Sequence, residues 1–113
     1  MPSRFEPCGL PQMVSPKYGT LRIAHDAGGI HDTVAPMSDD LDSGNGFLFQ
    51  HYTPDSLHWA ISEPLHFYRK STEAKAHHIT RIMKEASERL NHANTAKEYI
   101  NLYEKILGCP VTA

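Results

Sequence analysis

Apolar residues recur at three- and four-residue steps through the second half of the chain, which is the spacing of one face of an α-helix. Thr53 is a good N-cap and Pro54 suits the first helical position, so we expect a helix over residues 54–69. Its expected apolar face comprises Leu57, Ala60, Ile61, Leu65 and Tyr68. Pro64 lies inside this segment and predicts a kink or a split, because an interior proline removes a backbone hydrogen bond.

Two more helices are expected before the C-terminus. Ser71 or Thr72 is suited to cap the first of them, and Asn94 or Thr95 to cap the second. Their expected apolar faces comprise Ile79, Ile82, Met83, Ala86 and Leu90 in the first, and Ala96, Tyr99, Ile100, Tyr103, Ile106 and Leu107 in the second. The C-terminal half is therefore predicted to consist of three helices.

The first half of the chain predicts shorter elements. A helix is expected over residues 10–17, ending or kinking near Pro16, because proline is poorly tolerated inside a helix. Short strands are expected over residues 21–24 and 47–50, and a single helical turn over residues 30–34.

The order of these elements predicts an α/β fold. Residues 35–45, with aspartates at positions 39, 40 and 42, separate the two strands and predict a solvated loop. Strands that are connected through a helix pair in parallel, as in a Rossmann-like domain. Two short strands make a poor sheet by themselves, so we expect the chain to be part of a larger domain.

Composition narrows the possible functions. The 113 residues suffice for one small domain, and 40% hydrophobic and 21% charged residues are ordinary for a globular chain. A net charge of −2 gives no basic surface for nucleic acid, and no apolar run approaches the roughly 20 residues of a membrane-spanning helix. We expect neither nucleic acid nor a membrane as a partner. Cys8 and Cys109 form no disulfide framework, and no signal peptide is recognisable, which favours the cytoplasm.

The eight histidines do not follow a metal-binding pattern. No two of them are four residues apart, as zinc sites on a helix require, and His77 and His78 are adjacent, so they point about 100° apart on a helix. We therefore expect no metal site and no cofactor.

Residues 3–10 form the stretch that carries the most chemistry. Glu6 and Cys8 precede Gly9, which allows a close backbone approach or a positive φ, and a helix is expected to start just after it. Amides at a helix start attract anions, so a carboxylate beside such a turn suits a sugar-phosphate group. A plain loop-to-helix junction remains the alternative.

Four blocks of sequence, taken together, resemble the signature of bacterial glycogen synthases and plant starch synthases. They are PSRFEPCGL with the following Gln12 (residues 2–12), KYGT (17–20), AGGI with DTV (27–34), and GNGFLF (44–49). The blocks occur in the order and at the separations of that family. The resemblance implies part of a GT-B fold, in which two Rossmann-like domains face each other across a cleft. Residues 1–113 would be the C-terminal fragment of the nucleotide-sugar-binding domain, with donor-site motifs in 1–50 and C-terminal helices in 51–113.

The resemblance also implies an activity for the parent enzyme. Members of the family are retaining glycosyltransferases that move glucose from ADP-glucose to the non-reducing end of an α-1,4-glucan. The acid matching Glu6 would stabilise positive charge at the anomeric carbon. Substrate-binding positions would be Cys8, Gly9, Leu10, Gly28 and Gly29. From the residues alone, Glu6 could instead be a surface residue that caps the next helix, Cys8 a buried inert thiol, and the Gly-Gly pair an ordinary turn.

The chain departs from the family pattern near the expected site. Pro11 stands where the family usually has a threonine that helps to bind phosphate, Arg22 replaces a strand-entry proline, and Val14 stands where related retaining enzymes often carry a second acid. The basic residues that bind the diphosphate, and the acceptor domain, would belong to preceding sequence. We therefore expect no transferase activity from this chain alone. The alternatives are a non-catalytic module that complements a separate N-terminal synthase piece, and a stand-alone phosphosugar binder.

Overall fold

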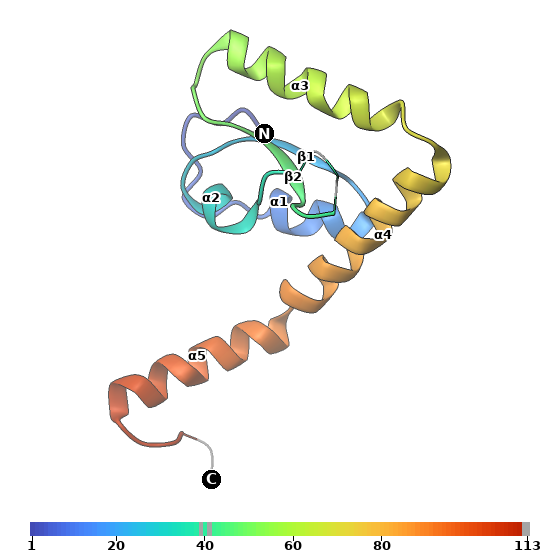
Figure 1. Ribbon diagram of the computed structural model, residues 1–113. Coiled ribbons are helices and arrows are strands. Elements are labelled where there is room, and N and C mark those ends of the chain that lie inside the picture. Colours follow the sequence, from blue (N-terminus) through green and yellow to red (C-terminus); the bar gives the residue numbers. More distant parts are fainter. Residues whose placement is uncertain (39, 41, 112–113) are drawn as a thin grey trace.

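The computed structural model describes residues 1–38, 40 and 42–111; Asp39, one of the loop aspartates, lies outside the described residues. Its elements are α1 (Pro11–Val14), the 3-10 helix η1 (Ser15–Tyr18), β1 (Arg22–His25), α2 (Gly29–Thr33), β2 (Gly46–Phe49), α3 (Pro54–Tyr68), α4 (Thr72–Arg89) and α5 (His92–Leu107) (Figure 1). The predicted α/β order is confirmed.

The two strands pair in parallel, with Arg22 opposite Gly46 and His25 opposite Phe49. Helix α2 lies in the connection between them, as a parallel pair requires. A small buried cluster of Ala24, Ile30 and Val34 joins β1 to that connection. Each strand lies one residue away from its predicted range, β1 later and β2 earlier.

The N-terminal segment runs along the other edge of β1. The Met1 ammonium donates to the Ile23 carbonyl at 2.6 Å, and the His25 amide donates to the Met1 carbonyl at 3.1 Å. A strand residue directs both backbone groups to one side, and the next residue directs them to the other. Met1 therefore lies beside β1 on the side away from β2, and the segment runs parallel to β1.

The first helix changes type where Pro16 predicted an interruption. The α-helical turn α1 ends at Val14 and continues as the 3-10 helix η1. Gly19, at φ +75°, closes η1 in the left-handed conformation that glycine adopts without strain. Helix α4 packs across η1 at this point, and the side chains of Ile79 and Met83 lie over Gly19.

Helix α3 corrects two expectations. It is one helix from Pro54 to Tyr68, so of the two outcomes predicted at Pro64, a kink or a split, the split does not occur. Its buried residues are Ala60, Pro64 and Phe67, whereas the predicted Ile61, Leu65 and Tyr68 are exposed. The inner face is therefore rotated by one residue from the predicted one, and the ring of Pro64 packs inward. The expected cap is confirmed, since the Thr53 hydroxyl accepts from the Ser56 amide.

Helices α4 and α5 differ in how they meet the rest of the molecule. Ser71 caps α4 as expected, and the helix buries His78, Ile82 and Ala86. Asn91 caps α5 by accepting from the Asn94 amide, which corrects the expected cap at Asn94 or Thr95. Helix α5 buries none of its residues and extends away from the other elements, so its predicted apolar face has no counterpart among the described residues (Figure 1).

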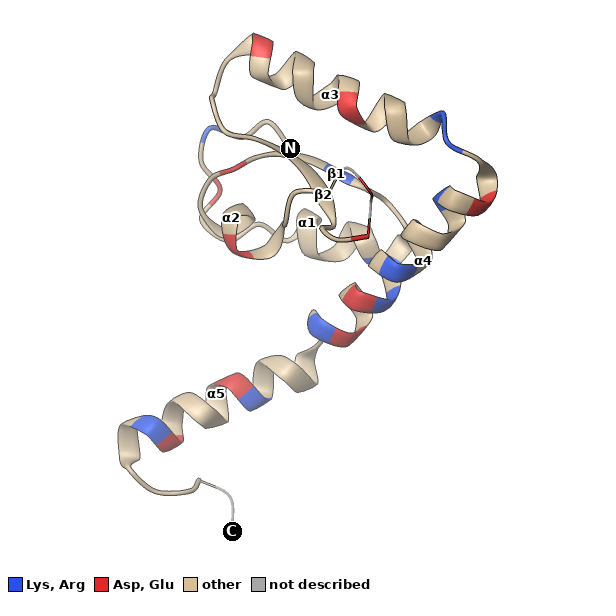
Figure 2. Ribbon diagram, viewed as in Figure 1, with Lys and Arg blue, Asp and Glu red and all other residues tan. Residues whose placement is uncertain are grey.

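Charges of both signs are mixed along the second half of α4 (Figure 2). Glu85 lies 3.5 Å from Arg81 and 2.9 Å from Arg89, each one helical turn away. Surface pairs at this spacing each contribute only about 0.3–0.5 kcal/mol to helix stability. Within the described ranges, none of the helices is long and apolar enough to cross a membrane.

Candidate functional site

Two turns that are far apart in the sequence lie against each other. The Gly29 amide donates to the Glu6 carbonyl at 2.9 Å. A Cβ on Gly28 would lie 2.1 Å from the Glu6 carbonyl oxygen, and a Cβ on Gly29 would lie 2.3 Å from the Cys8 carbonyl oxygen. Only glycine fits at either position. We call residues 6–9 and 28–29 the paired turns; they bring five of the six predicted site residues together.

The paired turns lie at the carboxyl end of the strands. Gly28 and Gly29 follow β1, and residues 6–9 follow the N-terminal segment that runs parallel to β1. His25, the last residue of β1, donates through Nδ1–H to the Ser3 carbonyl at 3.0 Å, which fixes the start of the first turn. In open α/β sheets, ligands bind in the crevice beyond this end of the strands.

Gln12 holds the first turn in place, a role that the sequence pattern did not predict. Its side chain is fully buried, and Nε2 donates to the Cys8 carbonyl at 2.6 Å. A Cβ on Gly9, which has φ +72°, would lie 2.3 Å from Gln12 Oε1. The sequence signal was present, because Gln12 belongs to the first motif block, but its task became visible only with the turn formed.

The predicted site residues differ in exposure. Glu6 is half-buried, and its carboxylate makes no hydrogen bond or ion pair within the described part of the chain. No side chain caps α1, so the alternative in which Glu6 caps that helix is wrong. Cys8 is exposed, which overturns the alternative of a buried inert thiol. The Leu10 side chain is also exposed, so only its backbone remains for a role in the turn.

No known family model matches the chain. Glycogen synthase from Halalkalibacterium halodurans is 41% identical over 108 residues, covering 96% of this chain and 22% of the relative. Glycogen synthase from Thermotoga maritima is 43% identical over 109 residues, with the same shares of 96% and 22%. The chain is related to the C-terminal part of glycogen synthases. It spans about a fifth of the length of these relatives.

A solved structure agrees with this relationship. The catalytic domain of starch synthase IV from Arabidopsis thaliana, bound to ADP and acarbose, has a TM-score of 0.66 and 32% sequence identity. The similarity covers 77% of this chain and 20% of the starch synthase chain. The chain is thus a partial Rossmann-like unit of a GT-B fold.

Arg22, one of the departures from the glycogen synthase pattern, ties the site together. Its guanidinium is buried and donates to the Gln12 carbonyl at 2.5 Å and to the Asn45 carbonyl at 2.6 Å. Burial lowers the pKa of Arg22 to about 10, and the charge of Glu85 opposes this change. The arginine therefore connects α1 to the loop before β2.

Pro11, the other departure from the synthase pattern at this turn, occupies the first position of α1. Proline is suited there because its missing amide would have no partner within the helix. With only four residues, α1 has too few aligned peptide dipoles to attract an anion strongly. The backbone of the paired turns is the better source of donors for a ligand.

An ion pair that the sequence did not predict flanks the second turn. His31 Nδ1 lies 2.8 Å from Asp26 Oδ1, across the Gly28–Gly29 turn. The hydrogen bond and the negative charge of Asp26 raise the pKa of His31. No sequence spacing marks such a pair, because the turn geometry alone brings the two side chains together.

The described residues contain no candidate metal site. No group of three or more histidine, cysteine, aspartate or glutamate side chains there is placed to hold an ion.

Proposed function

We propose that this chain is the donor-sugar part of an ADP-glucose-dependent glucosyltransferase that acts in the cytoplasm on α-1,4-glucan. It would be the C-terminal portion of the nucleotide-sugar-binding domain, with the donor-site turns in residues 1–50 and the C-terminal helices in 51–113. The observation that carries the proposal is the locked contact between the paired turns. That contact brings the Glu6 and Gly-Gly backbones together beyond the carboxyl end of β1, the end at which open α/β sheets bind ligands, and this supports the proposal.

Glu6 takes the catalytic role in this proposal. Breaking the bond between glucose and ADP develops positive charge at the anomeric carbon, and a fixed carboxylate lowers the energy of that state. Its half-buried position without a protein partner leaves the carboxylate available to a sugar. The backbone of Cys8, Gly9 and Leu10, together with Gly28 and Gly29, would contact the glucose hydroxyls and the donor phosphates.

The rest of the cleft must come from an N-terminal synthase part, on the same polypeptide or on a separate one. Two observations support such a partner. The outer edge of β1 is paired only at Met1 among the described residues, so it can accept a longer strand. Helix α5 also leaves apolar side chains exposed, among them Tyr99, Leu102, Tyr103 and Ile106. The non-catalytic module that complements such a part is the second candidate.

A complementation assay of glucose incorporation distinguishes a part of an enzyme from a chain that is active alone. The Halalkalibacterium halodurans synthase, shortened by its matching C-terminal region, is assayed with ADP-[14C]glucose and glycogen, alone, with this chain added, and fused to it. We expect no incorporation by either part alone and incorporation by the fusion. Incorporation by the chain alone would refute the proposal, and a folded but inactive fusion would favour the non-catalytic module.

A further inference from the structure

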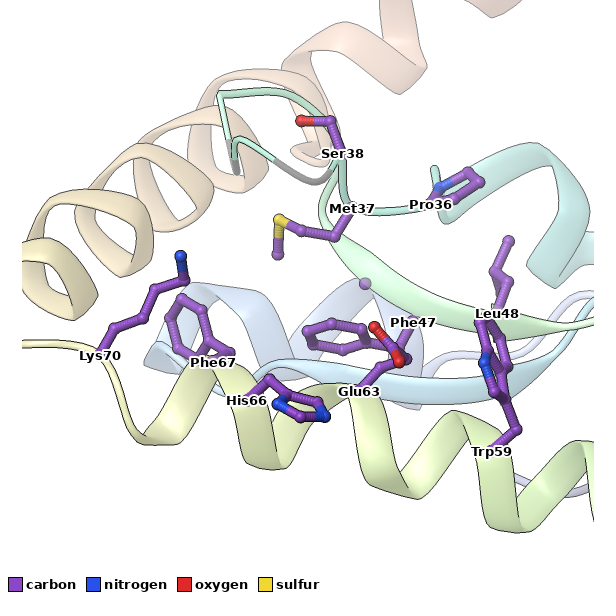
Figure 3. Close-up of a pocket in the computed structure, with 11 residues that line it drawn as sticks. Pro36, Met37, Ser38, Phe47, Leu48, Trp59, Glu63, His66, Phe67 and Lys70 are labelled. Atoms are coloured by element: carbon purple, nitrogen blue, oxygen red, sulfur yellow. The ribbon is translucent and has the colours of Figure 1, made fainter.

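Two adjoining hollows lie beside β2 and α3, and none of the residues of the paired turns lines either of them. One, of about 250 Å³, lies between β2 and α3 (Figure 3), and the other, of about 550 Å³, lies at the carboxyl end of the strands. Pro36, Leu48 and Trp59 line both, so the hollows meet at these side chains. We call the two together the α3 groove.

The indole of Trp59 lies where the two hollows of the α3 groove meet. Trp59 is 56% exposed and extends from α3 toward Leu48 (Figure 3). An exposed indole beside an aliphatic side chain offers a flat apolar face with one polar N–H at its edge. That combination suits a ligand with an apolar face and a polar rim.

Polar side chains continue along the same face of α3. Glu63 and His66 are four and seven residues after Trp59, and both line the hollow, with the Glu63 carboxylate directed toward Phe47 (Figure 3). Glu63 is half-buried and makes no hydrogen bond or ion pair within the described residues. Asp55 and Gln50 line the other hollow. Acceptors and donors therefore surround the indole on both sides.

The charges of the α3 groove favour a neutral ligand. Three carboxylates line it, from Asp26 (paired with His31), Asp55 and Glu63, against one lysine, Lys70. Phosphate groups would be repelled by this excess of acids. Sugar hydroxyls donate to carboxylates, and the apolar face of a pyranose ring can stack on an indole.

We propose that the α3 groove binds a segment of α-1,4-glucan, outside the donor site. The choice of this sugar polymer rests on the proposed function. The groove begins at Asp26, which flanks the second of the paired turns, and continues along α3 past Trp59 to Glu63. A polymer bound there would stay attached to the protein beside the site of transfer.

Trp59 provides the test, since it is the single tryptophan of the chain. Its fluorescence is followed while maltopentaose is added without ADP, and cellopentaose, which differs in linkage, serves as the control ligand. We expect a saturable change with maltopentaose at millimolar concentration and at least about tenfold weaker binding of cellopentaose. Glu63→Gln should weaken binding about tenfold, as expected for loss of a charged hydrogen-bond partner. Glu98→Gln, on exposed α5, should leave binding unchanged.

Affinity electrophoresis in glycogen gels repeats the comparison in the synthase fusion, with Trp59→Ala and, as its matched aromatic control, Tyr18→Ala, which is exposed and lines neither hollow. Circular dichroism checks that each variant is folded. Retardation lost only in Trp59→Ala supports the groove. Equal retardation of the two variants in the glycogen gel, or no fluorescence response to maltopentaose, overturns it. Glucan binding is read without a donor, whereas the proposed function is read as glucose incorporation, so either can fail while the other holds.

Discussion

Gly28, in the paired turns, is restricted both by its backbone conformation and by the space around it. Gly28 has a positive φ of +55° and also lies against the Glu6 carbonyl, where a Cβ would be 2.1 Å away. Gly108 shares the positive φ, at +69°, but has no atom within 4 Å of a built Cβ. The two differ in ψ as well, since Gly108 is in the ordinary left-handed conformation (ψ 14°) and Gly28 is not (ψ −135°). Gly108 therefore reports the cost of a left-handed side chain in open space, and Gly28 adds a conformation restricted to glycine and a steric clash.

Gly28→Ala is expected to destabilise the chain by about 2–4 kcal/mol, because the conformational and steric costs add. Gly108→Ala should cost only about 1 kcal/mol, since the conformational cost acts alone. Urea denaturation followed by circular dichroism measures both. Equal losses in the two variants would mean that the contact between the turns is not tight.

The Asp26–His31 pair makes a prediction about pH. Because Asp26 raises the pKa of His31, the pair stabilises the folded chain fully below the ordinary histidine pKa of about 6.5. That stabilisation is lost as pH rises through the raised pKa. Asp26→Asn should return the His31 pKa toward its ordinary value in an NMR titration, and should lower the melting temperature more at pH 5.5 than at pH 8.5. Asp55→Asn, on the surface of α3, is the control and should do neither.

Elements were predictable where local chemistry decides them. Thr53 and Ser71 cap α3 and α4 as expected, because each is followed by a clear helical stretch. The start of α5 was misplaced because Asn91, Asn94 and Thr95 are all competent caps within five positions. The buried face of α3 was predicted one residue away from where it lies. Which face is buried depends on how α3 packs against β2, and the helical period of apolar residues does not determine that packing.

Helices α4 and α5 have comparable apolar faces in sequence, but only α4 is packed. Ile82 on α4 is 1% exposed and Ile106 on α5 is 71% exposed. Ile82→Ala should destabilise the chain by about 2–5 kcal/mol, and Ile106→Ala by less than about 0.5 kcal/mol. Thermal unfolding of the 113-residue chain compares them. A loss at Ile106 as large as that at Ile82 would mean that α5 packs against the chain itself.

The whole molecule has the form of an unfinished domain. The sheet has two strands, the outer edge of β1 is paired only at Met1 among the described residues, and α5 is exposed. The chain also matches only about a fifth of the length of the glycogen synthase from Halalkalibacterium halodurans. The pattern of elements predicted membership in a larger domain. It did not predict that residues 6–9 would meet residues 28–29, because no local rule connects two distant turns. Only the resemblance between motif blocks pointed to that contact.

Some residues of the site could be predicted from the sequence and others could not. Gly28 and Gly29 could be proposed from their motif, and the steric fit against the first turn explains why glycine is needed there. The sequence showed Arg22 only as a departure from the synthase pattern, but its side chain is buried and donates to two backbone carbonyls. Long-range contacts of this kind depend on the assembled fold, so the sequence pattern could not indicate them.

Glucose incorporation by the synthase fusion, compared between Glu6→Gln and Glu98→Gln, tests the central claim most directly. Glutamine keeps the size of Glu6 and removes the charge that would stabilise the developing cation. We predict a loss of about 100-fold or more in the rate for Glu6→Gln, with unchanged thermal stability, and an unchanged rate for Glu98→Gln. A Glu6→Gln fusion that transfers glucose at the parent rate would contradict the assignment of this turn to the donor sugar.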